Sequence, residues 1–389
     1  MRWSVADVGD IAEVAIGPFG SSMKADEYVA EGVPVVAGGH LRDGRHPDLS
    51  SADMISAATA DRLARSLLAP GDLVFPHRGA IGRVGLADRP MMMSTSMMRA
   101  RFAPEVVDSS YAYWHFRGVA NAELLTMASS VGTPGIGQPL ASLRSVQFRY
   151  PPLPQQQRIA GVLNALDDQI VANRALLRSA DELVRVRYSC LPHGRARLGD
   201  IAEEIRQKIA PADIAPDCGY VGLEHFDRRL VWLQEWGAGS DVSSTKSVFV
   251  DRDVLFGKLR PYFHKVSTAP GSGVCSTDIL VIRAKDVRLS ALVLSACASD
   301  EVVAMAVQNS NGTRMPRAKW VDIADFSVPD PGLEETKAFV DFVDAVRLRC
   351  LAAVRENAVL ATARDELLPL LMDGRITVKE AEKRVEGVV

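Results

Sequence analysis

Two basic segments of the chain carry the residue types that bind nucleic acids. The first segment, residues 74–101, has the single acid Asp88 and these arginines: Arg78, Arg83, Arg89, Arg99 and Arg101. The second segment, residues 254–277, has no acid and these lysines and arginines: Lys258, Arg260 and Lys265. Both residue types bind phosphates, and both can read base edges in the major groove of DNA. The two segments therefore predict two DNA-contacting surfaces.

Catalytic signatures are missing from the sequence. An amino-methyltransferase needs an amide or acidic residue, two prolines and an aromatic residue, but YPPL at residues 150–153 lacks both ends of that motif. A phosphate-binding loop needs Ser or Thr after Gly-Lys, but Leu259 follows Lys258. Asp330 and Glu335 resemble a nuclease carboxylate pair, yet so short a separation cannot span the two strands of such a metal site. We predict no catalytic centre and no metal site in this chain.

Composition limits where such surfaces can lie. The chain has 389 residues, 47% of them hydrophobic, and a net charge of −3, so a DNA surface must be local. No stretch of 18 uninterrupted apolar residues occurs, which argues against a membrane protein. The five cysteines are widely spaced without a C-x-x-C motif, which is typical of reduced thiols and not of a zinc site. We predict a cytoplasmic protein.

The chain contains an internal repeat. The motif GDIAE occurs at residues 9–13 and again at 199–203. Further matching segments keep the same order: 71–75 with 252–256, 94–96 with 276–278, 130–133 with 311–313, and 151–154 with 329–331. The separation stays between about 180 and 190 residues throughout. Several matches in one order indicate a tandem duplication.

Each copy mixes strand and helix patterns. The strand-like segments are 33–36, 73–75 and 97–102 in the first copy, and 220–223, 246–250 and 279–283 in the second. Residues 111–128 and 291–308 have helical patterns. Each copy is therefore predicted to be an α+β domain.

Two long segments, residues 155–188 and 333–371, follow the proline runs and contain few helix breakers. Their apolar residues recur in alternating steps of three and four, the heptad pattern of a coiled coil. The first seam consists of Ile159, Leu163, Leu166, Ile170, Asn173 and Leu177. The second seam, with one extra step of four, includes Phe339, Val343, Val346, Val354, Asn357 and Leu368. Each segment predicts a helix roughly 50 Å long.

A narrow apolar stripe on a long helix needs a partner helix. Equivalent seams of a tandem duplication meet across a pseudo-two-fold axis, so we predict that the two helices pair as an antiparallel coiled coil. Heptad helices also serve as ordinary dimerisation elements, and this alternative stays open. The predicted organisation is a first recognition domain (1–152), a spacer helix (153–190), a second recognition domain (191–331) and a distal spacer helix with a tail (332–389).

We select the candidate DNA contacts by charge and by their place in the repeat. In the first copy they are Lys24, Arg42, Arg45, His77, Arg78, Arg83 and Arg99. In the second copy they are Lys246, Lys258, Arg260, His264, Lys265, Arg314, Arg317 and Lys319. The nearby aromatic residues Tyr262, Phe263 and Trp320 could stack on DNA, but packing in the core is the favoured interpretation.

Three motifs resemble one known family, the specificity subunits of Type I restriction-modification systems. PPLPQQQRIAGVLNALDDQI at residues 151–170, followed by Asn173 and Arg174, is similar to the family's central conserved helix. DELLPLLMDG at residues 365–374 is similar to the distal one, and GTPGIGQ at 132–138 to a motif that closes the recognition domain. The resemblance covers the whole chain, although the second proline run, at 328–333, departs from the pattern.

This resemblance implies a function and a set of partners. Each globular domain would read one half of a split, asymmetric target in double-stranded DNA, and the helices would set the gap. Two methyltransferase (modification) subunits and restriction-translocase subunits would bind the chain, with S-adenosylmethionine, ATP and Mg²⁺ only on those partners. The chain itself would be a non-catalytic recognition subunit.

Other functions remain open from the sequence alone. The same architecture would serve a specificity subunit of a combined restriction-methylation enzyme or of another phage-defence complex, which neighbouring genes would distinguish. An independent methyltransferase or nuclease would require this chain alone to bind S-adenosylmethionine or a metal. A coiled-coil adaptor without DNA binding would leave the duplicated basic segments without a role.

Overall fold

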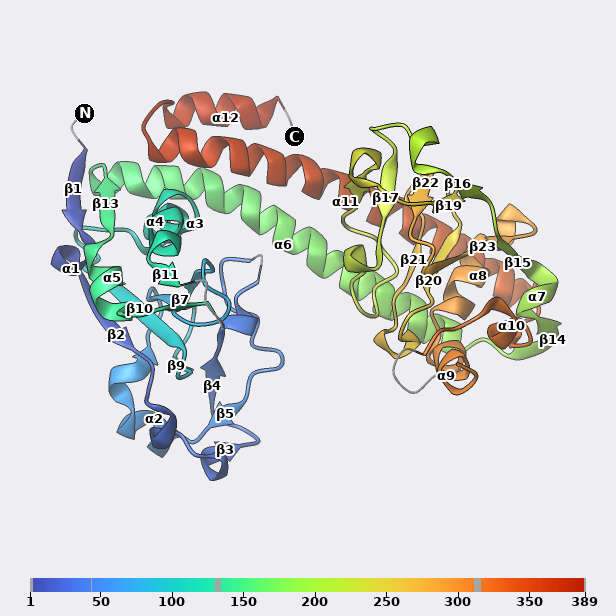
Figure 1. Ribbon diagram of the computed structural model, residues 1–389, viewed down its shortest axis with the longest axis horizontal. Coiled ribbons are helices and arrows are strands. Elements are labelled where there is room, and N and C mark those ends of the chain that lie inside the picture. Colours follow the sequence, from blue (N-terminus) through green and yellow to red (C-terminus); the bar gives the residue numbers. More distant parts are fainter. Residues whose placement is uncertain (1–2, 43, 130–133, 311–315, 388–389) are drawn as a thin grey trace. The chain divides into compact units, whose positions relative to one another are not determined.

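The computed structural model describes residues 3–42, 44–129, 134–310 and 316–387 (Figure 1). The chain forms two compact units. Unit 1 comprises Met1–Val171 and Ala358–Val389, and unit 2 comprises Ala172–Asn357. Each unit contains one copy of the repeat together with one half of each long helix.

Unit 1 is built on two sheets. The antiparallel sheet has the strand order β2 (Ala12–Ile16), β10 (Met97–Phe102), β7 (Leu73–Pro76) and β8 (Gly85–Leu86). The other sheet has the order β3 (Tyr28–Val29), β5 (Met54–Ile55), β4 (Val33–Val36), β9 (Met91–Met93) and β6 (Leu67–Leu68). Two further pairs are β1 (Ser4–Asp7) with β13 (Gln147–Tyr150) and β11 (Ala128–Ser129) with β12 (Gly135–Ile136).

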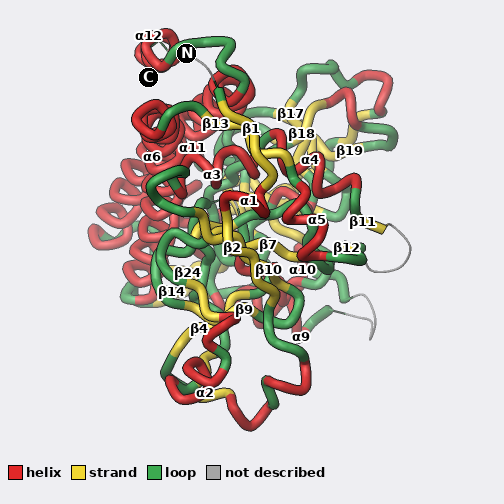
Figure 2. Tube along the Cα trace, turned by 90° about the vertical axis from the view of Figure 1, so that its left-hand side faces the viewer, coloured by secondary structure: helices red, strands yellow, loops and turns green. Residues whose placement is uncertain are grey.

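The helices of unit 1 pack against both sheets: the helix at Ala57–Arg62 places Ala60 in the core of the second sheet, and the others belong to the core of the first. The helices are α1 (Val8–Ile11), α2 (Ala57–Arg62), α3 (Ser109–Arg117), α4 (Val119–Thr126) and α5 (Pro139–Ser145). Helix α3 packs on β7 and helix α5 on β2 (Figure 2). The core between them buries Trp114, Phe116 and Phe148 almost completely. Burial of these large aromatic side chains contributes to the stability of the unit, because each removes a large apolar area from water.

Unit 2 repeats this arrangement. Its antiparallel sheet has the order β15 (Ala202–Ile205), β23 (Ile279–Ala284), β20 (Val254–Gly257) and β21 (Val266–Thr268). Its second sheet has the order β16 (Lys208–Ile209), β19 (Lys246–Phe249), β22 (Gly273–Cys275), β17 (Gly219–Val221) and β18 (Gly237–Ala238). The remaining elements are β14 (His193–Arg197), paired with β24 (Ser327–Pro329), and α7 (Leu198–Ile201), α8 (Ser290–Cys297), α9 (Asp300–Gln308) and α10 (Trp320–Ile323).

Strand pairing confirms the duplication. In the second sheet of each unit one pair is parallel, β4 with β9 in unit 1 and β17 with β22 in unit 2, whereas the strands next to them pair antiparallel. The first sheets also have the same order, with the longest strand, β10 or β23, between its two neighbours. The prediction of two α+β domains is therefore confirmed.

Each predicted domain helix is two helices. The segment predicted at 111–128 breaks at Gly118, whose φ of −99° and ψ of −113° are not helical. The segment predicted at 291–308 breaks before α9, where the Ser299 side chain accepts a hydrogen bond from the Val302 amide at 3.2 Å. A serine cap satisfies an amide that lacks a helical partner, so it starts a new helix there. The predicted helical character of both segments is confirmed, and in each copy it is divided between two helices.

The two spacer helices have nearly the predicted bounds. Helix α6 spans Leu153–Ser189 and helix α11 spans Glu334–Met372. In unit 2, Asn173 donates to Asn357 at 3.0 Å, and the rings of Tyr188 and Phe339 lie 5.9 Å apart. The later residue of α6, Tyr188, thus contacts the earlier residue of α11, Phe339. The two helices therefore run in opposite directions, which confirms antiparallel pairing within the chain.

The same pairing continues in unit 1. Arg364 of α11 lies 3.0 Å from Asp167 of α6, and Leu163 and Leu367 belong to one buried core. Ten of the twelve predicted seam residues are buried, and Asn357 is hydrogen bonded across the seam to Asn173. The remaining residue, Val346, is partly buried against the core of unit 2. A paired Asn at the equivalent seam position of each helix fixes register because neither amide can be buried without a partner.

A short C-terminal helix was not predicted. Helix α12 (Val378–Glu386) starts at Thr377, whose hydroxyl accepts from the Glu380 amide at 3.3 Å, and its Ala381 is buried in the core of unit 1. Figure 1 shows α12 beside the end of α11. In the described part of the chain no single helix is long and apolar enough to cross a membrane; α8 and α9 pass that test only as a bent pair, and every residue of α8 is buried.

Candidate nucleic-acid interface

The basic loop that follows β7 in unit 1 has the same backbone frame as the loop that follows β20 in unit 2. The His77 amide donates to the carbonyl of Ser96 at 2.9 Å, and the Lys258 amide donates to the carbonyl of Asp278 at 2.8 Å. In both units the acceptor lies in the turn between the strands of the two sheets. His77 and Lys258 are therefore equivalent positions.

A second segment closes each loop. The His77 carbonyl accepts from the Ile136 amide at 2.9 Å, and the Lys258 carbonyl accepts from the Ala318 amide at 3.0 Å. Leu259 and Arg317 form a bridge that matches the bridge between Arg78 and Gly135. Each candidate surface thus combines one basic loop with a segment far along the chain.

The positions of the arginines in the two loops differ by one residue. The backbone amide of Gly79 donates to the carbonyl of Pro134, and the backbone amide of Arg260 donates to the carbonyl of Pro316, each at 2.9 Å. Gly79 has a φ of 82° and Arg260 a φ of 51°, so both have left-handed backbone. Arg78 is therefore equivalent to Leu259, not to Arg260. A left-handed arginine is unfavourable and marks a strained loop, as functional loops often are.

Four predicted cations hold the loops in place. The side chains of His77 and Lys258 lie 3.3 and 2.9 Å from the carbonyls of Thr95 and Thr277. Arg83 donates to the carbonyl of Leu41 at 2.9 Å, and Lys265 donates to that of Leu223 at 2.5 Å. The strand registers make Arg83 and Lys265 equivalent. These four side chains position the surface, and burial lowers the pKa of both His77 and Lys265.

A matched histidine shapes the turn beneath each loop. His40 Nδ1 accepts from the Ala37 amide at 3.0 Å, and His225 Nδ1 accepts from the Gly222 amide at 2.9 Å. Sequence reasoning missed both histidines. The two histidines are 185 residues apart, a separation within the range of the repeat, and this was the signal that could have identified them.

A buried aspartate supports each sheet beside the loop. Asp72 binds Arg101 through two hydrogen bonds of 2.6 and 2.7 Å, and Asp253 binds Arg283 through two of 2.7 Å. Each aspartate is 1% exposed. The carboxylates raise the pKa of both arginines, which stay charged. Sequence reasoning missed this role, although Asp72 and Asp253 stand in matched segments of the repeat.

Two predicted contacts in unit 1 are corrected because the side chains are buried. Arg45 is 8% exposed and pairs with Asp167 at 3.4 Å and with Asp168 at 2.6 Å. Arg99 is 3% exposed and pairs with Glu13 at 2.6 Å. Both guanidinium groups are used inside the unit, so neither presents a cation to DNA.

Two predicted contacts in unit 2 are corrected for the same reason. Lys246 is buried and donates to the Ser244 hydroxyl at 2.7 Å. His264 is buried, with Nε2 2.8 Å from the Ala298 carbonyl and Nδ1 3.4 Å from Asp300. Burial of a cation requires partners in the protein, and these partners occupy the groups that DNA would need.

The remaining predicted cations lie at the surface. Lys24, Arg78 and Lys319 are exposed and Arg260 is partly exposed, and in the described part of the chain no ion pair engages them. Arg42 lies 3.9 Å from Asp48, and Arg317 lies 3.3 Å from Asp278. Arg314 lies outside the described residues. DNA contact by these surface cations stays a prediction.

One aromatic residue differs from the favoured interpretation. Tyr262 is 52% exposed, whereas Phe263 and Trp320 are partly buried. The Arg228 guanidinium lies 4.2 Å from the centre of the Phe263 ring and holds it. Tyr262 therefore extends from the basic loop of unit 2, where a base could stack on it.

Stability should depend on pH through His264. Burial lowers its pKa below the ordinary 6.5, so the folded state favours the neutral ring. Its contribution to the free energy of unfolding is present above pH 6.5 and decreases as the pH falls below that value. We expect acid to destabilise the unchanged protein more than the variant His264→Asn, because Asn tolerates the left-handed backbone but does not titrate. Urea unfolding on both sides of this pH measures the difference; equal pH dependence would contradict the prediction.

The described residues offer no cluster for a metal ion, and three of their thiols are buried. Among them no group of three His, Cys, Asp or Glu side chains is close enough to hold a metal ion. Burial raises the pKa of Cys275, Cys297 and Cys350 to about 12, which keeps these thiols protonated. What the two basic loops offer is charge, hydrogen-bond donors and the exposed ring of Tyr262.

Comparison with known proteins identifies a family, a related sequence and a solved structure that this chain resembles. Residues 2–178 match the family described as Type I restriction modification DNA specificity domain. The Type I restriction enzyme MjaIX specificity subunit of Methanocaldococcus jannaschii is 28% identical over an alignment of 419 positions, which covers 97% of this chain and 94% of that protein. The crystal structure of the Type I restriction-modification S subunit from M. genitalium aligns with a TM-score of 0.60 at 12% identity, covering 95% of this chain and 96% of that one. This last likeness shows a shared fold.

Proposed function

We propose that the chain is a specificity subunit of a Type I restriction-modification system, because residues 2–178 match that family's DNA specificity domain, and that its two repeats bind the two halves of a bipartite, asymmetric DNA target. One observation carries the proposal. Both units build a basic loop on the same backbone frame, yet they place different side chains on it, Arg78 in one and Arg260 with Tyr262 in the other. A common frame with different contact groups suits two readers of different sequences.

Partner subunits supply the chemistry in this proposal. The chain binds DNA and carries no reaction of its own, while methyltransferase and restriction-translocase subunits hold S-adenosylmethionine, ATP and Mg²⁺. The complex acts on DNA in the cytoplasm. Purified chain alone should transfer no methyl group from S-adenosylmethionine to target DNA and should cleave none with ATP and Mg²⁺. Activity that persists after the partners are removed would overturn the non-catalytic role.

Methylation mapping tests the recognition role. The full chain is co-expressed with its methyltransferase subunits, and methylated adenines are mapped across the genome. We expect a single motif with two unlike halves separated by a fixed gap. Substitution of Arg78 should relax one half only, and substitution of Arg260 the other half only. A continuous or symmetric motif would contradict the proposal.

A further inference from the structure

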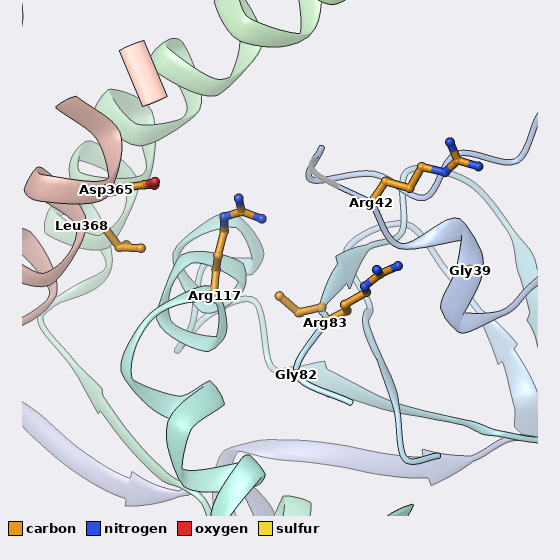
Figure 3. Close-up of a pocket in the computed structure, with 8 residues that line it drawn as sticks. Gly39, Arg42, Gly82, Arg83, Arg117, Asp365 and Leu368 are labelled. Carbon is orange, nitrogen blue, oxygen red and sulfur yellow. The ribbon is translucent and has the colours of Figure 1, made fainter. Parts of the chain in front are cut away.

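Unit 1 contains an arginine-lined cavity of about 770 Å³ between its domain and helix α11. Figure 3 shows Arg42, Arg83 and Arg117 around it, with Asp365 of α11 beside Arg117. The three arginines come from three separate segments: the loop after the turn Gly38–His40, the loop before β8, and the end of α3. The fold therefore collects their charges at one place.

The cavity has an excess of positive charge. Asp365 is the one acid among the described residues that line it, and Arg364 already binds that carboxylate at 2.9 Å. Within the described part of the chain, Arg117 has a single weak hydrogen bond, from Nη1 to the Tyr113 hydroxyl at 3.4 Å. A guanidinium has five N–H donors, so Arg42, which lies 3.9 Å from Asp48, and Arg83, which donates to the Leu41 carbonyl, also retain N–H groups that can bind an anion.

Unit 2 shows that the fold does not require this charge. The equivalent seam residues Asn173 and Asn357 are 184 residues apart. The same separation makes Asp181 equivalent to Asp365, and Val184 equivalent to Leu368. Asp181 and Val184 line a cavity of about 300 Å³ in unit 2. The two cavities are therefore equivalent in the repeat.

In the cavity of unit 2, the arginines form ion pairs with aspartates that line the same cavity. Its Arg185 binds Asp181 at 2.7 Å, and its Arg229 binds Asp300 at 2.8 Å. Arg42 lies two residues after His40, and Asp227 lies two residues after the matched His225, so the two positions are equivalent. The charge at this position is therefore positive in unit 1 and negative in unit 2. Among the described residues, Arg117 of the unit 1 cavity has no ion pair and Arg42 has only a long one, 3.9 Å from Asp48, whereas Arg185 and Arg229 of the unit 2 cavity are each paired within 3 Å.

We propose that the cavity lined by Arg42, Arg83 and Arg117 binds one phosphodiester of the DNA backbone, as an anchor that unit 2 lacks. The proposal rests on the proposed function. Arginine presents a planar fork of donors that matches the oxygens of a phosphate. A phosphate contact fixes the position of a protein on DNA without reading sequence. The two recognition domains therefore hold DNA unequally.

Removal of two of these arginines tests the anchor. We compare the full complex with the double variant Arg42→Ala/Arg117→Ala, which leaves the bond from Arg83 to the Leu41 carbonyl intact. We expect target binding to weaken about tenfold. The slope of log K against log salt should fall by about one unit, and the methylated motif should stay the same. Arg229→Ala, at the self-paired cavity of unit 2, is the matched control and should change neither measurement.

A scan with neutral phosphates locates the contact. Each backbone phosphate of the target is replaced in turn by a methylphosphonate, and binding is measured for both forms of the complex. We expect one position at which the replacement weakens the unchanged complex but not the double variant. Equal losses for both forms at every position would overturn the anchor. If neither form binds the mapped target, the proposed function fails instead.

A free anion is the other source of the same chemistry. Inorganic phosphate, tested against chloride at equal ionic strength, should compete with target DNA only weakly. Saturable phosphate binding that the double variant abolishes, together with no sensitive position in the scan, would assign the cavity to a free anion and overturn the DNA anchor.

Discussion

The variant Asp167→Ala should lower the free energy of unfolding of unit 1 by about 3 to 5 kcal/mol, because it leaves two buried arginines without a shared counter-ion. Asp167 is 1% exposed and lies between Arg45 of the first domain, at 3.4 Å, and Arg364 of α11, at 3.0 Å. It joins the domain to both spacer helices. Urea unfolding of the full chain, followed by hydrogen exchange in unit 1, measures the loss.

The neighbouring residue provides the matched control. Asp168 also binds Arg45, at 2.6 Å, but its side chain is 65% exposed. Water screens an exposed pair, so Asp168→Ala should cost less than about 1 kcal/mol. A second variant, Asp167→Ala with Arg364→Leu, should recover part of the stability because it removes one of the stranded charges. Equal losses for Asp167→Ala and Asp168→Ala would show that the buried network does not hold the domain.

Loss of either surface arginine of the two loops, Arg78 or Arg260, should weaken target binding by about 1 to 3 kcal/mol if the residue reads a base, or roughly 5- to 150-fold. The variants are Arg78→Ala and Arg260→Gly. Glycine is chosen because Arg260 has left-handed backbone and Gly79 occupies the equivalent position in unit 1. Binding to the mapped target at fixed salt measures the effect.

Paired surface arginines serve as controls for this experiment. Arg89 binds Asp88 at 2.9 Å, and Arg288 binds Asp286 at 2.6 Å, outside the two loops. Arg89→Ala and Arg288→Ala should leave affinity nearly unchanged. A loss of about one unit of salt slope without relaxed specificity would make Arg78 or Arg260 a phosphate contact instead. Unchanged affinity would remove the residue from the interface.

Periodic patterns in the sequence predicted most of the fold. The heptad seam predicted α6 and α11 to within a few residues, because a stripe of apolar residues repeats along a helix whatever else the chain does. The repeat predicted two like domains for the same reason. Breaks such as Gly118 were missed because one residue does not disturb an average over a helical window.

The candidate site was only partly predictable. Sequence grouped cations by neighbourhood, and this grouping found the loops of Arg78 and Arg260. It also selected Arg45 and Arg99, which are buried and paired with residues far along the chain, Asp167 and Glu13. It passed over Arg117, which reaches the arginine cavity only because α3 packs near α11.

The sequence by itself determined the duplicated architecture, the two seams and the existence of local positive charge, because these properties reside in spacing and composition. Only the tertiary structure decided which charges face solvent. A guanidinium becomes available to DNA or is used inside the protein according to whether a carboxylate or carbonyl lies within about 3 Å, and such partners here come from positions up to 197 residues away.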